Sequence, residues 1–384
     1  MMRISLFYYT LIILMITSCI KPFDPGIKED ASNKFVVQGS VSSVEGWQYV
    51  YISRTSNISQ AVFNPINDCQ VEIIDGEGNT YTLNQFEEGV YRVWMSSTDL
   101  VSYRSYMVKV ITSDGQILES DFDLLPEGPD QVGEVYYEIK NIPTNDPDYT
   151  IHGVQFYTNL LADPEDSRFY RWKLVETWEY HTEYPIEYYY DGIVHQVSPP
   201  DTSQKYCWKS LLVPEVYTLS TVNLTENGLN AIPLNFIYNT SDRLKIKYSL
   251  HIEQSALSED AYNYWDKLRI NSNQDGGLYT TQPLAVKGNI KNLTNPENEV
   301  LGFFQANAIS TKRIFVDPVP DFELNILSTC QVNTLRFGLI EIPVTEYPAY
   351  LFSSGGNYAL ATMTNECVLC SASGGSNTKP DFWP

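Results

Sequence analysis

Four of the six cysteines lie in the second half of the chain, and their spacing allows three kinds of chemistry. Cys367 and Cys370 form a C-x-x-C pair, whereas Cys207 and Cys330 stand alone. Such a set fits a redox pair, a four-cysteine zinc site or two structural disulfides. The redox interpretation lacks a βαβ setting, and zinc would want a second close pair. We therefore expect two disulfides. Three connectivities are open, and we favour bonds from Cys367 and Cys370 to Cys207 and Cys330, since these would tie the C-terminal tail to a sheet.

The first cysteine, Cys19, follows an N-terminal leader. Residues 1–18 hold Arg3 and then an apolar run over Leu6–Ile16, which has the length of a signal-peptide core and is too short to span a bilayer. Ser18 directly precedes Cys19, as a small residue does in the lipobox of bacterial lipoproteins. We expect lipidation of Cys19, with the several acyl chains that stable anchoring needs. The alternative is an ordinary secreted protein cleaved near Ser18.

The common catalytic motifs are missing from the sequence. Its four histidines show no metal-ligand spacing, and it contains no nucleophile elbow, Walker loop or dinucleotide fingerprint. We expect no enzymatic activity, no cofactor and no metal, although two glycosidase carboxylates close only in space would escape such a search. The acidic stretch Asp75–Asn79 lacks the residue order of an EF-hand loop and is predicted to be a hairpin turn.

The densest aromatic run extends over Trp178–Tyr190. Its rings are Trp178, Tyr180, Tyr184, Tyr188, Tyr189 and Tyr190. As a protruding hairpin, the run would offer a rigid amphipathic surface to a glycan, a peptide or a partner protein. The alternative, which we favour, is that the rings pack across strands within a sheet. The run is still the one candidate binding surface that the sequence offers.

The charge balance excludes one class of partner. The chain has 47 acidic and 25 basic residues, a formal net charge of −22. Such a surface repels nucleic acid, and no basic face is visible in the sequence. We interpret the acidic excess as a contribution to solubility.

The elements that position these residues are mainly strands. After a tether over residues 19–34, short alternating runs separated by turns extend over residues 35–125, as in Phe35–Gly39 and Asp68–Ile73. This pattern predicts an immunoglobulin- or transthyretin-like β-sandwich. Cys69 should lie on an inward face of this sandwich as a buried free thiol.

The prolines around Pro126 mark a boundary, and residues 126–384 are predicted to form a larger antiparallel β domain with one packed helix and a disulfide-stapled tail. The alternation over Leu244–Glu253 predicts a half-buried strand with His251 on the solvated side.

A helix over about 258–271 begins at the capping residue Ser258. Ala261, Trp265 and Leu268 recur at helical spacing and should pack against the sheet, while Gly276 and Gly277 would end the helix.

Several short pieces occur in a fixed order behind the lipobox. They are Val37-Gln-Gly, Tyr262-Asn-Tyr-Trp, Gly276-Gly-Leu-Tyr, Gly288-Asn-Ile, Val300-Leu-Gly-Phe-Phe, Arg313-Ile-Phe-Val, Cys367-Val-Leu-Cys and Lys379-Pro-Asp-Phe-Trp. In this order they resemble an uncharacterised lipoprotein family of Bacteroidota, commonly encoded beside TonB-dependent outer-membrane receptors. The resemblance implies an outer-membrane lipoprotein that faces the cell surface and no catalytic residues. One departure is that only Asp24 provides acidity just after Cys19, which leaves the periplasmic leaflet open.

These features favour a non-enzymatic binding or accessory component of a TonB-dependent uptake system, anchored to the outer membrane by lipid, with a small glycan or peptide as ligand. The alternative is a structural or adhesive envelope lipoprotein, and a lesser alternative is a secreted hydrolase that uses carboxylates.

Overall fold

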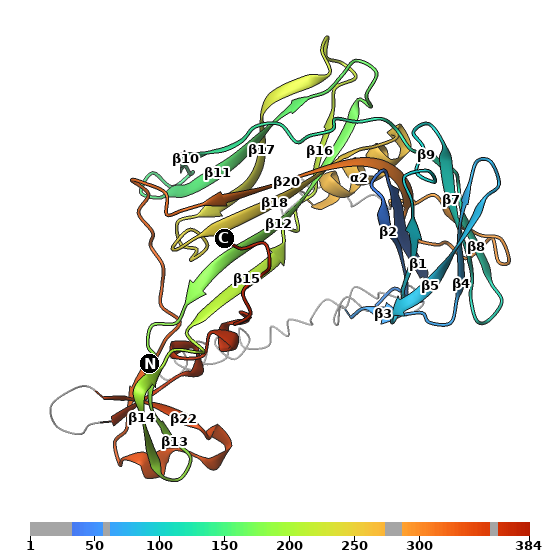
Figure 1. Ribbon diagram of the computed structural model, residues 1–384. Helices are drawn as coiled ribbons and strands as arrows, with labels where there is room; N and C mark the ends of the chain where they lie inside the picture. Colours follow the sequence, from blue (N-terminus) through green and yellow to red (C-terminus); the bar gives the residue numbers. More distant parts are fainter. Residues whose placement is uncertain (1–32, 57–61, 273–285, 354–359) are drawn as a thin grey trace, which may run out of the picture.

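The computed structural model describes residues 33–56, 62–272, 286–353 and 360–384, and this part of the chain is mainly β with one α-helix (Figure 1). The strands form a 15-stranded sheet, a three-stranded sheet and a five-stranded sheet. The predicted fold class is therefore confirmed. The leader, Cys19 and the tether up to residue 32 lie outside the described residues. Within the described part, none of the helices combines the length and the apolar character that crossing a membrane requires.

The first part of the long sheet folds into a sandwich, at the right of Figure 1. Its strands are β1 (Phe35–Ser42), β2 (Gly46–Arg54), β3 (Asn64–Pro65), β4 (Gln70–Asp75), β5 (Thr80–Glu87), β6 (Val90–Met95), β7 (Ser105–Ile111), β8 (Ile117–Ser120) and β9 (Asp123–Leu124). Side chains alternate between buried and exposed along β1, β4 and β7, as the sequence pattern predicts. Val37, Ile52 and Val71 meet in the core between the two layers.

The turn after β4 is a hairpin, as predicted. The Asp75 carboxylate accepts hydrogen bonds from the backbone N–H groups of Glu77 and Asn79, at 3.0 and 2.8 Å, and pairs with Arg104 at 3.2 Å. These partners occupy the carboxylate that a calcium ion would need. Cys69 departs from expectation, because its free thiol is half-buried at the edge of the core rather than fully buried. It lies between Asp68, which has a positive φ of 58°, and Gln70, where β4 begins.

Residues far along the chain complete this sandwich. β19 (Ile290–Asn292) pairs with β8, and β20 (Phe304–Val316) pairs in parallel with β1. Ile290, Val300 and Phe304 accordingly belong to the first core. The predicted division between residues 125 and 126 thus does not separate two independent sheets, since the chain returns to the first core after the helix.

The second core lies between two layers. One layer consists of β12 (Phe169–His181), β15 (Tyr206–Leu212), β16 (Tyr217–Ser220), β18 (Tyr248–Ala256) and the rest of β20; the other consists of β10 (Val135–Pro143), β11 (Thr150–Leu161) and β17 (Gly228–Tyr238). Phe156, Trp172 and Leu250 are among the side chains buried between them. This arrangement gives the long β12, β18 and β20 one face toward the core and one face free to bear a site.

The strand predicted over Leu244–Glu253 needs correction. Residues 244–247 form a turn, although Leu244 is buried, and β18 begins at Tyr248. His251 is half-buried rather than solvated, because β18 lies between β12 and β20 and Arg313 is its direct neighbour on β20. Burial, reinforced by Arg313, lowers the pKa of His251.

The helix follows the prediction closely. α2 covers Glu259–Ser272, and the Ser258 hydroxyl accepts a hydrogen bond from the Ala261 N–H at 3.1 Å. Ala261 and Trp265 are buried and Leu268 is partly buried in one cluster with Phe303. The predicted stop at Gly276 and Gly277 lies outside the described residues.

The C-terminal region forms a small separate sheet, at the lower left of Figure 1. Its strands are β13 (Ile186–Tyr190), β14 (Val194–Asp201), β21 (Val332–Thr334), β22 (Ala349–Ser353) and β23 (Leu360–Met363), accompanied by the 3₁₀ helices η2 (Leu339–Glu341), η3 (Val344–Glu346), η4 (Asn365–Cys367) and η5 (Cys370–Ser373).

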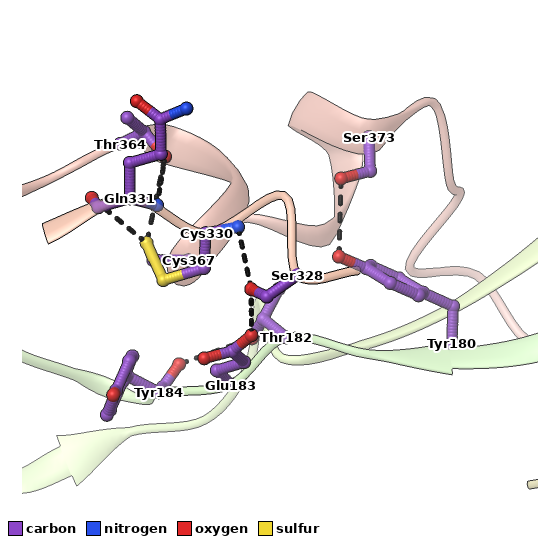
Figure 2. Close-up of a disulfide and its surroundings, with 10 residues drawn as sticks. All are labelled: Tyr180, Thr182, Glu183, Tyr184, Ser328, Cys330, Gln331, Thr364, Cys367 and Ser373. Atoms are coloured by element: carbon purple, nitrogen blue, oxygen red, sulfur yellow. Dashed lines mark hydrogen bonds between the residues drawn. A yellow bond between two sulfur atoms is a disulfide. The ribbon is translucent and has the colours of Figure 1, made fainter. Parts of the chain in front are cut away.

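Two disulfides hold this region, as the cysteine pattern predicts. Cys207 is bonded to Cys370, and Cys330 is bonded to Cys367. Figure 2 shows the second bond beside Ser328, whose hydroxyl contacts Glu183 and accepts a hydrogen bond from the Cys330 N–H at 3.0 Å. The first bond connects the tail to β15, where Trp208 and Ser376 exchange two backbone hydrogen bonds. These bonds exclude the redox pair and the zinc site, because Cys367 and Cys370 are each bonded to a cysteine elsewhere in the chain.

Candidate functional site

A cleft of about 490 Å³ lies where the long sheet passes from the sandwich to the second core. The joint is β20: Phe304–Asn307 pair in parallel with Gly39–Ser42 of β1, whereas Ala308–Val316 pair antiparallel with β18. In Figure 1 this orange strand bridges the two bodies beside α2. One continuous strand therefore carries residues to both walls of the cleft.

Strand register determines which side chains share the floor of the cleft. Ser40 on β1 lies between Tyr49 of β2 and Gln305 of β20. On the other side of the joint, Arg171 of β12 lies opposite Ser255 of β18. Directly paired residues on neighbouring strands point to the same face, so polar side chains from five strands meet on one surface.

The helix supports this floor through Trp265. Its indole N–H donates to the Gln305 side-chain oxygen at 2.6 Å, and Gln305 donates in turn to Asn307 at 3.3 Å. Asn307 then donates to the Ser255 hydroxyl at 3.2 Å. This chain of buried hydrogen bonds fixes the two amides, because each alternative orientation would leave a buried polar group without a partner.

Arg171 lies on the same wall. Its guanidinium carbon is 3.5 Å from the centroid of the Trp265 ring, a cation–π arrangement. Its Nε is buried and has no hydrogen-bond partner. Burial lowers the pKa of Arg171 to about 10, while the nearby Glu253 opposes the shift. Arg171 is therefore still a cation at neutral pH, and it is only partly exposed to water.

Exposed aromatic rings continue the floor on the sandwich side. Trp47 and Tyr51 of β2 are 44% and 46% exposed, and Tyr51 stacks on Tyr49 with ring centroids 6.4 Å apart. Trp94 of β6 is opposite Trp47 and meets it edge-on at 5.6 Å. Arg92 lies over the Trp47 ring at 4.1 Å and holds it in place. Gathered exposed rings of this kind mark a surface for binding.

The aromatic run Trp178–Tyr190, the one candidate binding surface of the sequence, is divided between two sheets. Trp178 is buried in the second core and Tyr180 packs against it, whereas Tyr184 packs in the C-terminal sheet. Tyr188 and Tyr190 pack against a further cluster in that sheet, and Tyr189 stacks on His195. These rings pack within the fold, in agreement with the favoured interpretation, and they do not form one exposed patch.

The sequence contained a signal for the cleft that its interpretation missed. Trp47, Tyr49 and Tyr51 alternate along one strand, which places three rings on a single face. By contrast, no local pattern identifies Arg171 or Gln305, because their neighbourhood depends on pairings between distant strands. Gln38, Trp265 and Phe303, which belong to the pieces that carry the family resemblance, all line the cleft.

A second, smaller cavity of about 300 Å³ lies between β9 and α2. Asp121, Asp123 and Asp260 line it, but only Asp123 is buried. Its carboxylate accepts a hydrogen bond from the Ala306 N–H at 2.7 Å, and burial raises its pKa to about 6. Asp121 instead pairs at the surface with Lys291 at 2.5 Å. Among the described residues that line this cavity, none is a second buried carboxylate beside Asp123.

A protein-family model described as "Domain of unknown function (DUF4249)" matches residues 20–313. The chain belongs to this family. The expected membership of an uncharacterised family is confirmed, and the DUF4249 range includes every residue named above for the cleft. The lipid anchor and the Bacteroidota origin stay predictions. No curated protein matches the sequence.

Among solved structures, the chain is similar to trypsin-activated alpha-2-macroglobulin from Escherichia coli, with 10% identity and a TM-score of 0.18 over 62% of this chain and 15% of that chain. It is also similar to a structure titled for host cell surface retention of a 1.5-MDa bacterial ice-binding adhesin, with 11% identity and a TM-score of 0.16 over 79% of this chain and 70% of that chain. At these scores we draw no argument from either likeness. The chain spans a small fraction of the macroglobulin.

Proposed function

We propose that this protein captures an oligosaccharide at the cell envelope, in the cleft beside β20, and catalyses no reaction there. The observation that carries the proposal is the combination of exposed rings and fixed polar groups on one concave surface. Its volume of about 490 Å³ falls within the range of small-molecule sites.

The lining chemistry suits sugars. Trp47 and Tyr51 present flat, partly exposed rings on which the apolar face of a pyranose can stack. Gln305 and Asn307 carry both donors and acceptors, as sugar hydroxyls require. Because Trp265 holds this amide pair in place, a ligand would lose little affinity to ordering the site.

The same lining supports binding without hydrolysis. Among the described residues that line the cleft, the one carboxylate is Glu253. Glycoside hydrolysis by the usual mechanism requires two carboxyl groups about 5 to 10 Å apart. We therefore assign capture rather than cleavage to this site.

The proposed location rests on the leader. The lipobox ending at Cys19 supports a lipid-anchored protein of the outer membrane, and the resemblance supports a role as accessory to a TonB-dependent receptor. Cys19→Ala should move the native-level protein from the membrane fraction to the soluble fraction. Two results together would favour the structural or adhesive alternative instead. The tagged wild-type protein would copurify with no outer-membrane barrel, and a deletion strain would lose attachment but keep nutrient uptake.

Binding itself is tested with the purified full chain on an oligosaccharide array, followed by calorimetry on the best ligand. The double variant Trp47→Ala/Tyr51→Ala should bind that ligand about tenfold more weakly, because two stacking rings are lost. Tyr149→Ala is the control, since Tyr149 is also an exposed ring, at 59%, but lies outside the cleft. Equal losses in both variants, or no ligand on the array, would refute the proposal.

A further inference from the structure

The charge of the cleft differs in sign from that of the whole chain. The charged residues that line it are Arg171, Lys173 and Glu253, two cations against one anion, whereas the chain carries a formal net charge of −22. None of the three takes part in an ion pair of the described chain. A local cationic site in so acidic a protein would attract an anionic group only at short range, because salt screens the more distant charges.

Arg171 is the cation with the fewest partners. A guanidinium has five N–H donors, and buried ones are normally satisfied. Here the Nε is buried without a partner, and no hydrogen bond joins the other two nitrogens to a described residue. Trp265 covers one face of the group but offers no acceptor to it. The arginine is thus held flat at the cleft wall, and the donors of its two terminal nitrogens have no partner among the described residues.

We infer that the captured oligosaccharide is acidic, a chain of uronate or sialate type whose carboxylate pairs with Arg171 while its rings stack toward Trp47. This inference rests on the proposed function and names its ligand class. A carboxylate matches the planar fork of a guanidinium with two parallel hydrogen bonds, which a neutral sugar cannot supply.

The other charged groups near Arg171 define where the carboxylate can sit. Glu253 on β18 pairs in register with Lys173, two residues along β12 from Arg171, and it repels an anion placed close to it. The phenol of Tyr264, from α2, also influences Arg171 and is uncharged at neutral pH, since burial raises its pKa. The anionic group is therefore favoured on the side of Arg171 away from Glu253.

The test compares an acidic ligand with its neutral ester. Calorimetry with the full chain measures binding of oligogalacturonate, of the same oligomer fully methyl-esterified, and of a sialyl oligosaccharide, which separates the two carboxylate sources. The wild-type protein should prefer one acidic ligand over its ester by about tenfold or more, as expected for hydrogen bonds to a charged group. Arg171→Gln should abolish this preference, weakening the binding of the acidic ligand far more than the binding of the ester. Glu253→Gln should strengthen the binding of the acidic ligand.

Two further variants make the result specific. Arg171→Lys keeps the charge but loses the fork, and it should recover only part of the preference. Arg313→Gln is the control, since this arginine lies on β20 outside the cleft, with its guanidinium 3.6 Å from the Phe382 ring centroid. The melting temperature of each variant is measured alongside, so that lost binding is not mistaken for unfolding.

The outcomes separate the inference from the function beneath it. If neutral and esterified oligosaccharides bind as tightly as acidic ones, the inference fails and the proposed function stands. If no oligosaccharide of either kind binds, both fail. Binding of a glutamate oligopeptide through Arg171, without any sugar binding, would overturn the assigned ligand class.

Discussion

Asp123 offers the most quantitative test of how the joint is held together. Its side chain is only 5% exposed, and its carboxylate accepts the Ala306 N–H between Gln305 and Asn307, the two amides of the cleft floor. The carboxylate also receives a hydrogen bond from Ser258 at the start of α2. Asp123 therefore fixes the cleft from beneath, although it does not line it.

Burial, which the bonds from Ser258 and Ala306 oppose, raises the pKa of Asp123 from 3.8 to about 6. The folded state thus favours the neutral acid. Its stabilising contribution is fully present below pH 3.8, the unfolded value, and is lost as the pH rises through about 6. A difference of about two pKa units corresponds to about 3 kcal/mol of unfolding free energy across that window.

Asp123→Asn removes the titrating group, so the free energy of unfolding should depend less on pH between about pH 4 and pH 7.5. The free energy of unfolding, from urea titrations followed by tryptophan fluorescence, is measured for both proteins at intervals from pH 4 to pH 7.5. Relative to wild type, the variant should gain about 2 kcal/mol of unfolding free energy from pH 4 to pH 7.5, because part of the roughly 3 kcal/mol is already lost at pH 4. Asp121→Asn is the control, because Asp121 is a neighbouring exposed carboxylate. A difference between Asp123→Asn and wild type that is constant with pH would refute the reasoning.

Two further predictions concern the fold. Replacing either disulfide by a pair of serines should cost about 2 to 5 kcal/mol of unfolding free energy. Loss of Cys207–Cys370 should cost about 1 kcal/mol more than loss of Cys330–Cys367, because in the chain-entropy model it closes a loop of 163 rather than 37 residues. Equilibrium unfolding measures both costs, and the reverse order would contradict the prediction. Gly302→Ala should cost more than about 3 kcal/mol, because φ is +95° and the new Cβ would lie 2.0 Å from the Val37 carbonyl oxygen. Gly115→Ala, with φ at +81° and open space around the Cβ, should cost only about 1 kcal/mol, and an equal loss in thermal unfolding would argue against the clash.

The features that the sequence predicted well are those encoded by near neighbours. Ser258 caps α2 through a bond to Ala261, three residues away, and the buried face of the helix follows from spacing alone. The Asp75 turn is equally local, since its carboxylate binds groups two and four residues ahead. The disulfides could be predicted for a different reason. The expected leader favours an oxidising compartment, and the four cysteines of the second half lack the spacing of a zinc site.

The cleft escaped prediction because it is built from long-range pairings. β1 and β20 pair in parallel although Gly39 and Phe304 are 265 positions apart in the sequence. No pattern in either strand predicts that the other is its neighbour. Parallel neighbours need not be close in sequence, so register between them cannot be derived from turn type as it can in a hairpin. The dense run Trp178–Tyr190 misdirected attention for a related reason: density along the chain differs from density in space, and its two strands join different sheets.

The joint also explains why the cleft can act as a rigid receptor. A site between two domains normally opens and closes when their interface is small. Here β20 belongs to both bodies, and its backbone is bonded to β1 on one side of the cleft and to β18 on the other. Trp265 and Asp123 brace the same strand from α2 and from β9. Opening the cleft would break these ladders together, so the rings near Trp47 and the guanidinium of Arg171 are held at a fixed spacing. A ligand that spans both is therefore selected by length as well as by charge, and oligomers too short to reach from Arg171 to Trp47 should lose the stacking contribution while keeping the carboxylate contact.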